Sequence, residues 1–562
     1  MGSVDRLTSK TVQMRNGLSL WTVCAVATPL VIIVASIVWS LHHPFGVHWD
    51  EAIYLNQAQI DAQRLQHGML LKLGGRILIK SAGRPPAYRI LALPILGLFG
   101  FHTTVVRLVS IACFALSALF VYLAARRVGS SVAGGFATLI FCLSPVVVSA
   151  CMWFGTEGPL YLATSAMLYY IFKCWTDKSD YWSNWVGLGL AIGIGLLAKA
   201  SFVVIMLPVL AFWLAVGRRR ESGIPKLAAL WKAGLLALLV AGPWWLLNVR
   251  PAIAMTREAR GFVANSLGPP SLATWLRWLG TVGQGLLGYG LSILIMLVVI
   301  ASVREAMVRN KAFLDPLQRM AIGACACAGG PIILVQLTGT NHLLRHISPA
   351  MIPLAVVVGM LADWSGWARS VPSVVTSCVL FCAQLGMIVA PVFVPNKHPL
   401  DSGLVNASLP WRIMTRREQW NWEPLLRISR DCGVDSPVIA YLGMGPTFNP
   451  PQIERPWAAA AGSAGGATYA YPDVQLLWRY ELGPLDWQKV MGSAEHSDIV
   501  VTAPHYVGEL ADKDDSDNQY NAEFAGRLAT SPLFRSPISL EMGRFDPVEV
   551  VVFVKKSLPC QP

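Results

Sequence analysis

The chain has 562 residues, of which 54% are hydrophobic and only 14% are charged, and its mean hydropathy is +0.50. A soluble core of this size does not need so much apolar surface, so the composition excludes an ordinary soluble protein and predicts one embedded in lipid. The net charge of +13 comes from short basic clusters between apolar runs, which is typical of a membrane protein, so no nucleic-acid partner is expected.

The first apolar run, residues 18–41, follows a short tail that carries Arg6, Lys10 and Arg15. This run is longer than the hydrophobic part of a cleaved signal peptide, and no small-residue cleavage site precedes the next element. We therefore expect a cytoplasmic N-terminal tail over residues 1–17 and a retained first helix. The chain is then a multi-pass protein of the cell inner (plasma) membrane.

Apolar runs of about 20 residues, the length that a bilayer core requires, recur through residues 18–394. They predict a polytopic α-helical membrane protein of about eleven transmembrane helices, near residues 18–40, 104–125, 131–151, 157–174, 185–200, 201–217, 227–247, 281–303, 320–338, 348–363 and 371–394. With the N-terminus inside, every basic cluster between closely spaced helices lies in the cytoplasm, as the positive-inside rule requires. The opposite face receives a long first external loop, residues 41–103, and most of the unusual polar residues.

The polar region after the helices, residues 395–562, is predicted to be an extracytoplasmic soluble α/β domain. Sequence patterns predict strands at 438–442, 498–502 and 548–554, helices near 423–432 and 484–493, and a loop over the Gly/Pro/Ala-rich stretch 443–466. Cys432 and Cys560 are the only cysteines outside apolar runs, and in an exported domain they can form a disulfide. Aromatic residues such as Tyr471 and Trp478 can stack on sugars or simply pack a small core, and acceptor selection is the role expected for this domain.

An acidic cluster follows the first helix directly, where Asp50 and Glu51 are adjacent and His48, Trp49 and Tyr54 lie close in sequence. Two carboxylates at the membrane surface can supply a general base or a metal ligand for a lipid-borne substrate. An Asp and a Glu at a helix start also suit the helix dipole. The residues alone leave both explanations open.

Basic residues on the exported side run against the positive-inside bias. Lys80 and Arg84 precede a Pro-Pro pair, and Tyr88 follows it. Such cations attract either a phosphate group or the phospholipid headgroups of simple surface anchoring. His342 and Arg345 form a second basic group before another predicted helix, where an Arg can hold a phosphate bidentately. A zinc site is not expected there, since no further ligands stand at suitable spacing.

Two charges occupy gaps between closely spaced helices. Glu157 follows Thr156 between the third and fourth predicted helices, and Lys199 lies between the fifth and sixth. A carboxylate near hydrocarbon needs water, a cation or a basic partner, so Glu157 is a candidate functional residue. Capping of a helix explains Thr156 and Glu157 equally well, and snorkelling to the interface explains Lys199.

The order of these features resembles that of the GT-C glycosyltransferases, in particular the protein O-mannosyltransferases and the lipid A aminoarabinose transferases. The resemblance defines residues 18–394 as a GT-C-like transmembrane catalytic domain, and its motifs are Asp50–Glu51, Arg84–Pro86, Thr156–Glu157, Gly195–Lys199, Gly242–Trp245 and Arg345–Pro353. The family's frequent Arg-Tyr pair is replaced here by Arg345–His346.

The resemblance implies transfer of a hexosyl or pentosyl group from a polyprenyl-phosphate donor to a glycan, lipid or protein acceptor on the extracytoplasmic face. Asp50 matches the family's catalytic carboxylate and Glu157 its second acidic residue, and Glu51 is a further catalytic candidate beside Asp50. The expected donor phosphate-binding residues are Lys80, Arg84, Lys199, His342 and Arg345. The expected acceptor or sugar-binding residues are His48, Trp49, Tyr54 and Tyr88. The spacing demands no cofactor, although Asp50 and Glu157 can share a divalent cation, Mg or Mn.

The chemistry agrees with these residues. Asp50 can deprotonate an acceptor hydroxyl as the hydroxyl oxygen attacks the anomeric carbon, while cations stabilise the departing lipid phosphate. Inversion of the anomeric centre is therefore expected.

Three other functions remain open: a flippase or transporter of lipid-linked glycans, a ligase that joins preassembled glycans, and an envelope scaffold. A flippase would bury charge along a central pathway, whereas the predicted helices here are nearly free of charge.

Overall fold

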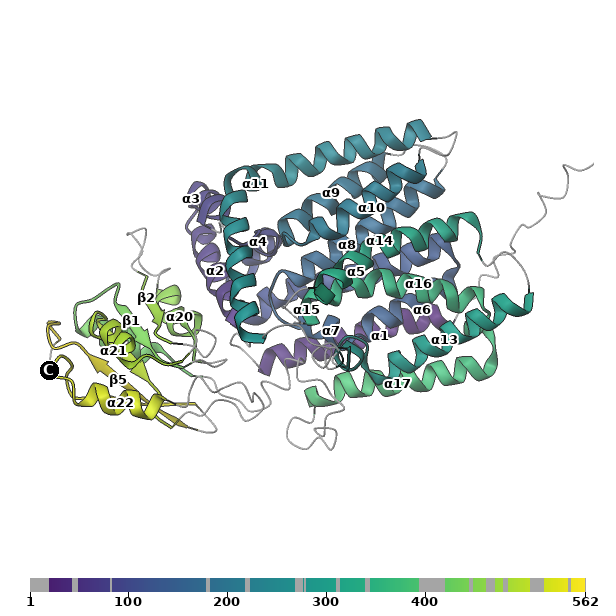
Figure 1. Ribbon diagram of the computed structural model, residues 1–562. Helices are drawn as coiled ribbons and strands as arrows, with labels where there is room; N and C mark the ends of the chain where they lie inside the picture. Colours follow the sequence, from purple (N-terminus) through teal and green to yellow (C-terminus); the bar gives the residue numbers. More distant parts are fainter. Residues whose placement is uncertain are drawn as a thin grey trace, which may run out of the picture.

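The computed structural model describes residues 20–42, 49–80, 83–177, 182–217, 223–267, 276, 279–280, 282–309, 314–338, 344–393, 420–443, 448–460, 471–478, 484–505, 520–543 and 547–560. The molecule consists of a large helical bundle and a small C-terminal domain that lies against one end of it (Figure 1). This arrangement of a helical membrane part followed by an α/β domain is the fold class that the sequence predicted.

Each of the eleven predicted apolar segments is helical over most of its length. The helices of the bundle are α1 (Leu20–His42), α5 (Thr103–Val128), α6 (Ser131–Cys142), α7 (Pro145–Met152), α8 (Glu157–Thr176), α9 (Trp182–Ala198), α10 (Phe202–Gly217), α11 (Gly223–Leu267), α13 (Gly288–Arg309), α14 (Pro316–Thr338), α16 (Met351–Trp364) and α17 (Val371–Phe393). Shorter turns precede α13 and α16, namely η2 (Val282–Leu287), α15 (Leu344–Ile347) and η3 (Ser348–Ala350).

Within the described residues, seven helices are long and apolar enough to cross a membrane, or eight if the bent pair α6 and α7 forms one span. The predicted number of eleven crossings is therefore not confirmed. Two of the remaining segments are short, because α9 has 17 residues and α10 has 16. The axes of α6 and α7 differ by 66°, and Pro145 begins α7, a position in which proline starts a new helix and does not continue the old one.

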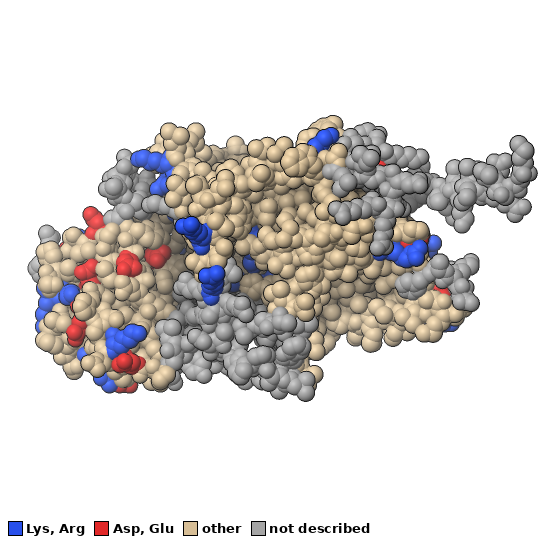
Figure 2. Space-filling model, turned by 45° about the horizontal axis from the view of Figure 1, so that its top comes forward, with Lys and Arg blue, Asp and Glu red and all other residues tan. Residues whose placement is uncertain are grey.

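The outer surface of the bundle is apolar. Large hydrophobic side chains are exposed along α1, α11, α13 and α17, among them Leu30, Leu239, Ile300 and Val379. Charged side chains gather instead on the C-terminal domain and near the ends of the helices, and the surface between is almost free of them (Figure 2). This distribution suits contact with lipid tails, so the chain is a multi-pass membrane protein.

The long first loop expected over residues 41–103 is mostly helical. Its elements are α2 (Trp49–Gln66), α3 (Leu70–Gly75), η1 (Arg76–Lys80) and α4 (Ala87–Phe99). These helices have a core of their own, in which Tyr54, Tyr88 and Phe154 pack together. Two ion pairs, Arg89–Asp61 and Arg107–Glu51, are buried in the same region. Three of these four residues lie in the predicted first loop, and Arg107 alone lies in a helix that was predicted to be nearly free of charge.

The C-terminal domain contains a five-stranded sheet with the order β2-β1-β3-β5-β4. The strands are β1 (Val438–Tyr441), β2 (Asp473–Leu476), β3 (Ile499–Thr502), β4 (Ile538–Met542) and β5 (Val548–Val554), and the helices are α19 (Glu423–Asp431), α20 (Pro450–Ala460), α21 (Trp487–Glu495) and α22 (Asn521–Ala529). Strand β1 runs parallel to both β2 and β3, whereas β5 is antiparallel to β3 and β4. Apolar residues pack on both faces of the sheet.

The predicted strands β1, β3 and β5 and the helices α19 and α21 are present, and Cys432 is bonded to Cys560. The prediction of a loop over residues 443–466 was wrong, because α20 lies within it. Prolines at the first positions of a helix are favourable, so Pro450 and Pro451 start this helix where the sequence suggested a break.

Candidate active site

The carboxylate of Asp50 lies between two guanidinium groups that come from distant parts of the chain. Arg84 Nη1 donates to Asp50 Oδ1 at 3.0 Å, and Arg345 Nη2 lies 2.7 Å from Asp50 Oδ2. The three side chains are 18–23% exposed, so they are screened from bulk water but remain accessible to a ligand. Sequence-predicted catalytic and phosphate-binding residues thus meet at one point.

The local sequence around Asp50, Arg84 and Arg345 determines how each side chain is placed in the site. Asp50 is in the first turn of α2, where a carboxylate is favoured by the helix dipole. Arg84 precedes Pro85, and a residue before proline avoids the helical conformation, so Arg84 stands outside α4. Arg345 is held by the turn after it, because Ser348 Oγ donates to the Arg345 carbonyl oxygen at 2.8 Å and also hydrogen-bonds Tyr161 of α8.

A second charged cluster surrounds Glu157, the first residue of α8. Lys199 Nζ donates to Glu157 Oε1 at 3.0 Å and lies 3.3 Å from His346 Nδ1. The hydroxyl of Thr156 donates to the other carboxylate oxygen of Glu157 at 3.2 Å. The Glu157 side chain is only 3% exposed, and Lys199 therefore supplies the counter-charge that this burial requires.

The two clusters adjoin each other. Arg345 and His346 are neighbours in α15, and each takes part in one cluster. A Cβ atom at Gly155 would lie 3.2 Å from Glu157 Oε2 and 3.4 Å from the ring of Tyr54, which shows how closely α2 and the start of α8 approach. Together, three cations face two carboxylates, so the combined site carries a net positive charge.

Glu51 has a different environment from Asp50. Its side chain is completely buried, and Arg107 of α5 donates to both of its oxygens, at 2.8 and 3.0 Å. The backbone N–H of Phe154 donates to the same carboxylate at 2.9 Å. Glu51 thereby ties the start of α2 to α5 and to the turn before α8. Because this carboxylate is completely buried, whereas that of Asp50 is 18% exposed, the structure does not favour the catalytic role predicted for Glu51.

Two tyrosines predicted to bind acceptor or sugar lie beneath the site. Tyr88 is fully buried and hydrogen-bonds Gln57, so its contact with a substrate is not favoured. The guanidinium carbon of Arg84 lies 5.3 Å above the ring of Tyr54. Burial and the charge of Asp50 raise the pKa of Tyr54 above its ordinary value. Burial alone lowers the pKa of Arg84, but Tyr54 and Asp50 outweigh it and raise this pKa.

The structure leaves four of the predicted side chains undescribed. His48 and His342 lie outside the described residues, and the side chains of Trp49 and Lys80 do so as well, although Trp49 begins α2 and Lys80 ends η1. Their predicted roles stay predictions.

The predicted metal-binding pair does not have the surroundings of a cation site. Asp50 is paired with Arg84 and Arg345, and Glu157 is paired with Lys199. Among the residues that the structure describes, no group of three or more His, Cys, Asp or Glu side chains is gathered for a metal. A site with more cationic than anionic side chains fits an anion better than Mg²⁺ or Mn²⁺.

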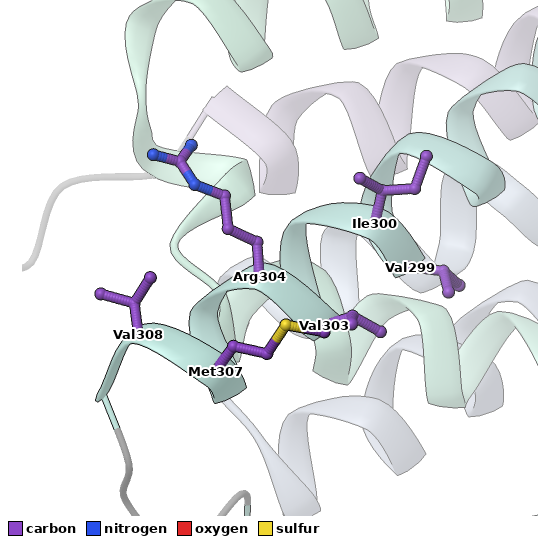
Figure 3. A pocket seen from close by; sticks show the side chains of 6 residues that line it. All are labelled: Val299, Ile300, Val303, Arg304, Met307 and Val308. Carbon is purple, nitrogen blue, oxygen red and sulfur yellow. The ribbon is translucent and has the colours of Figure 1, made fainter.

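A groove on α13 lies away from these clusters. It is lined by Arg304 and by apolar residues, and its side chains project from a single exposed helix (Figure 3): Val299, Ile300, Val303, Met307 and Val308. This groove is at the C-terminal end of α13, whereas the N-terminal end adjoins η2, which contacts α15. The predicted site and this groove are therefore at opposite ends of the helix.

Sequence reasoning missed several supporting residues. Arg107 holds Glu51, and Arg89 donates to both oxygens of Asp61 at 2.6 Å. The signal for Arg107 was a lone charge at the start of an apolar helix, where an unpaired guanidinium would be costly. Trp153, whose ring lies 5.6 Å from the guanidinium carbon of Arg345, carried no such signal.

Comparison with known sequences matches part of the chain. The family model "Dolichyl-phosphate-mannose-protein mannosyltransferase" matches residues 83–246. Undecaprenyl phosphate-alpha-4-amino-4-deoxy-L-arabinose arabinosyl transferase 1 of Pseudomonas fluorescens is 28% identical over 232 residues, which are 39% of this chain and 40% of that protein. The matched region thus spans about two fifths of the relative's length.

Solved structures extend the likeness over nearly the whole chain. ArnT from Cupriavidus metallidurans in the apo state superimposes with a TM-score of 0.55 at 15% identity, covering 96% of this chain and 99% of ArnT. The same protein bound to undecaprenyl phosphate gives a TM-score of 0.55 at 16% identity, with the same coverage of both chains. The protein is therefore a multi-pass membrane protein with the fold of the GT-C glycosyltransferases, as its sequence predicted.

Proposed function

We propose that the protein transfers a sugar from a polyprenyl-phosphate donor to an acceptor on the extracytoplasmic face, with inversion and with Asp50 as the general base. The observation that carries this proposal is the position of the Asp50 carboxylate between Arg84 and Arg345. Such a reaction needs a base with phosphate-binding side chains beside it, and both arginines lie within hydrogen-bond distance of Asp50.

The cationic side chains suit a lipid phosphate. The Nε atom of Arg345 is buried and has no hydrogen-bond partner among the described residues, so this donor can serve a ligand. An arginine can offer two parallel N–H groups to a phosphate, and the bond is strengthened by opposite charge. The similarity to an undecaprenyl-phosphate-sugar transferase and to a protein solved with undecaprenyl phosphate supports a polyprenyl-phosphate donor.

Donor binding changes the partners of the two arginines. Without donor, they neutralise Asp50, and a carboxylate held by two guanidinium groups is a weak base. A donor phosphate competes for the same N–H groups and draws them from Asp50. The freed carboxylate then accepts the proton of the acceptor hydroxyl while the oxygen forms its bond to the anomeric carbon. The bond between this carbon and the phosphate oxygen breaks, and the electron pair leaves with the lipid phosphate.

Glu157 has a supporting role in this scheme. Its carboxylate fixes Lys199 and lies in the same electrostatic environment as Arg345. Lys199 therefore stands ready beside the arginines to stabilise the phosphate as negative charge develops on it. Replacement of Glu157 should impair the reaction less directly than replacement of Asp50.

The extracytoplasmic location is supported by the C-terminal domain. This domain lies at the end of the bundle that carries α2, and it contains the Cys432–Cys560 disulfide (Figure 1). Disulfides persist in oxidising compartments and are rare in the cytosol. The site on α2 is expected to face the same compartment.

Sugar transfer in membranes tests the proposal. Membranes with the wild type or with Asp50→Asn are given a panel of radiolabelled polyprenyl-phosphate sugars and their endogenous acceptors, and Asp431→Asn, at an exposed position, is the matched control. We expect transfer by the wild type and the control and its loss in Asp50→Asn. Transfer that survives in Asp50→Asn would assign the base elsewhere. Failure of the wild type with every donor would favour a flippase or a scaffold.

A further inference from the structure

Helix α20 of the C-terminal domain is seated directly on α2, the helix that begins with the Asp50 segment (Figure 1). Asn56 of α2 is 4% exposed, and its Nδ2 donates to the Pro451 carbonyl oxygen at 2.7 Å. Farther along α2, Gln63 Nε2 lies 3.2 Å from the carbonyl oxygens of Ala458 and Ala459. The side chains of α2 thus hold the two ends of α20.

A chain of polar side chains crosses the same contact. Tyr471, which precedes β2, shares hydrogen bonds with Asn56 of α2 and with Glu454 of α20. Arg455, the next residue of α20, interacts electrostatically with the buried Arg107–Glu51 pair, and burial together with Arg107 lowers the pKa of Arg455 to about 10. The charge of Arg455 therefore acts on the ion pair that fixes the start of α2.

Asn56 and Asp50 lie close together along α2. Asn56 is six residues from Asp50, less than two helical turns, so a displacement at Asn56 is transmitted to Asp50 through a rigid helix. Two buried ion pairs, Glu51–Arg107 and Asp61–Arg89, also hold α2. Asn56 lies between these two, on the part of the helix that the C-terminal domain covers.

We propose that α20 is a positioning element of the active site, which holds α2 through the Asn56–Tyr471–Glu454 chain so that Asp50 is aligned only while the C-terminal domain is docked. This inference rests on the proposed function. Asn56, Tyr471 and Glu454 act through α2 and do not touch the reacting atoms, so they are positioning residues. The role is one of alignment, which affects the rate of transfer more than the affinity for donor.

The Asn56–Tyr471–Glu454 chain of side chains contains one group, the Glu454 carboxyl, whose pKa lies near neutral pH. Burial raises the pKa of Glu454 to about 7, Tyr471 opposes this by donating a hydrogen bond, and the charge of Asp473 adds to it. Asn56 of α2 and Arg76 of η1 act on Tyr471, not on Glu454 directly. A carboxyl whose pKa is raised by folding stabilises the docked state when protonated, and this contribution is lost as pH rises from 4.5 through about 7.

Hydrogen exchange of α2 in the full chain, in lipid nanodiscs, measures this docking without any substrate. Exchange is compared between pH 6 and pH 8 after correction for the intrinsic chemical rate. We expect Tyr471→Phe to speed exchange of α2 amides about fivefold to tenfold, the range for one lost hydrogen bond. Tyr520→Phe is the matched control, because its ring packs against Trp478 and Trp487 inside the C-terminal domain. Glu454→Gln should remove the pH dependence of exchange that the wild type shows.

Transfer kinetics complete the test. Tyr471→Phe should lower kcat about fivefold and leave KM for a polyprenyl-phosphate sugar unchanged, and Glu454→Gln should flatten the pH profile between pH 6 and pH 8. Equal exchange and equal kcat in Tyr471→Phe and Tyr520→Phe would overturn the inference. If α2 exchange responds as expected but the wild type transfers no sugar, the docking stands, and the proposed function fails together with the positioning role.

Discussion

Asp50→Asn is expected to bind the lipid phosphate more tightly than the wild type does, although it should lose the ability to transfer sugar. The amide keeps the shape of the carboxylate but removes its charge. Arg84 and Arg345, which lie 3.0 and 2.7 Å from the Asp50 oxygens, then have no anionic partner at this position. A phosphate that enters the variant no longer has to displace a carboxylate.

The size of the effect follows from the exposure of these ion pairs. At 18–23% exposure they are neither surface pairs, which contribute about 0.2–1 kcal/mol each, nor deeply buried pairs, whose disruption costs about 3–5 kcal/mol. In the wild type, Asp50 competes with the phosphate for both arginines. After a reduction for partial screening by solvent, this competition makes the free energy of phosphate binding less favourable by about 1–2 kcal/mol in total. The dissociation constant of the phosphate is then expected to fall about tenfold.

Equilibrium binding of undecaprenyl phosphate to purified protein in nanodiscs measures this directly. Arg345→Ala should weaken binding, and Asp431→Asn, which removes a charge from an exposed position, should leave the affinity unchanged. An Asp50→Asn variant that binds equally well or more weakly than the wild type would refute the competition between carboxylate and phosphate.

Two further predictions concern stability and topology. Lys199→Met leaves the buried Glu157 carboxylate without its cation, so the Tm should fall by an amount that corresponds to about 3–5 kcal/mol. Adding Glu157→Gln should restore most of the lost stability. A fall in Tm that the second change does not reverse would argue against the ion pair as the cause. Cys432 and Cys560 should react with a membrane-impermeant maleimide only after reduction and only from the extracytoplasmic side, and labelling of either thiol without reductant would contradict the disulfide.

Hydropathy and charge predicted the bundle well because a membrane imposes strong rules on sequence. Apolar length and the placement of basic clusters located the helical segments of the bundle outside the first loop, but they did not reveal how long each helix is or where it bends. The break between α6 and α7 depends on Pro145 and on packing within the bundle. The helices of the first loop were missed, since the polar sequence of α2 becomes stable only through buried partners such as Arg107 and Arg89.

The candidate site was predictable residue by residue but not in its arrangement. Asp50, Arg84 and Arg345 are unusual residues at a membrane boundary, which singled them out, yet nothing in the sequence predicted that both arginines contact one carboxylate. Asp50 and Glu51 are adjacent and chemically alike, and only their different burial and partners separate a reactive group from a structural one. The contact between α20 and α2 joins residues about 395 positions apart, a separation at which a single sequence carries no pairing signal.

Sugar transfer by Asp50→Asn at saturating donor tests the central claim most directly, because donor occupancy and transfer are measured in the same sample. With a radiolabelled polyprenyl-phosphate sugar in nanodiscs, we predict that the variant holds at least as much donor as the wild type and transfers none of it to the acceptor. Transfer at the wild-type rate by the donor-loaded variant would contradict the role of Asp50 as the base.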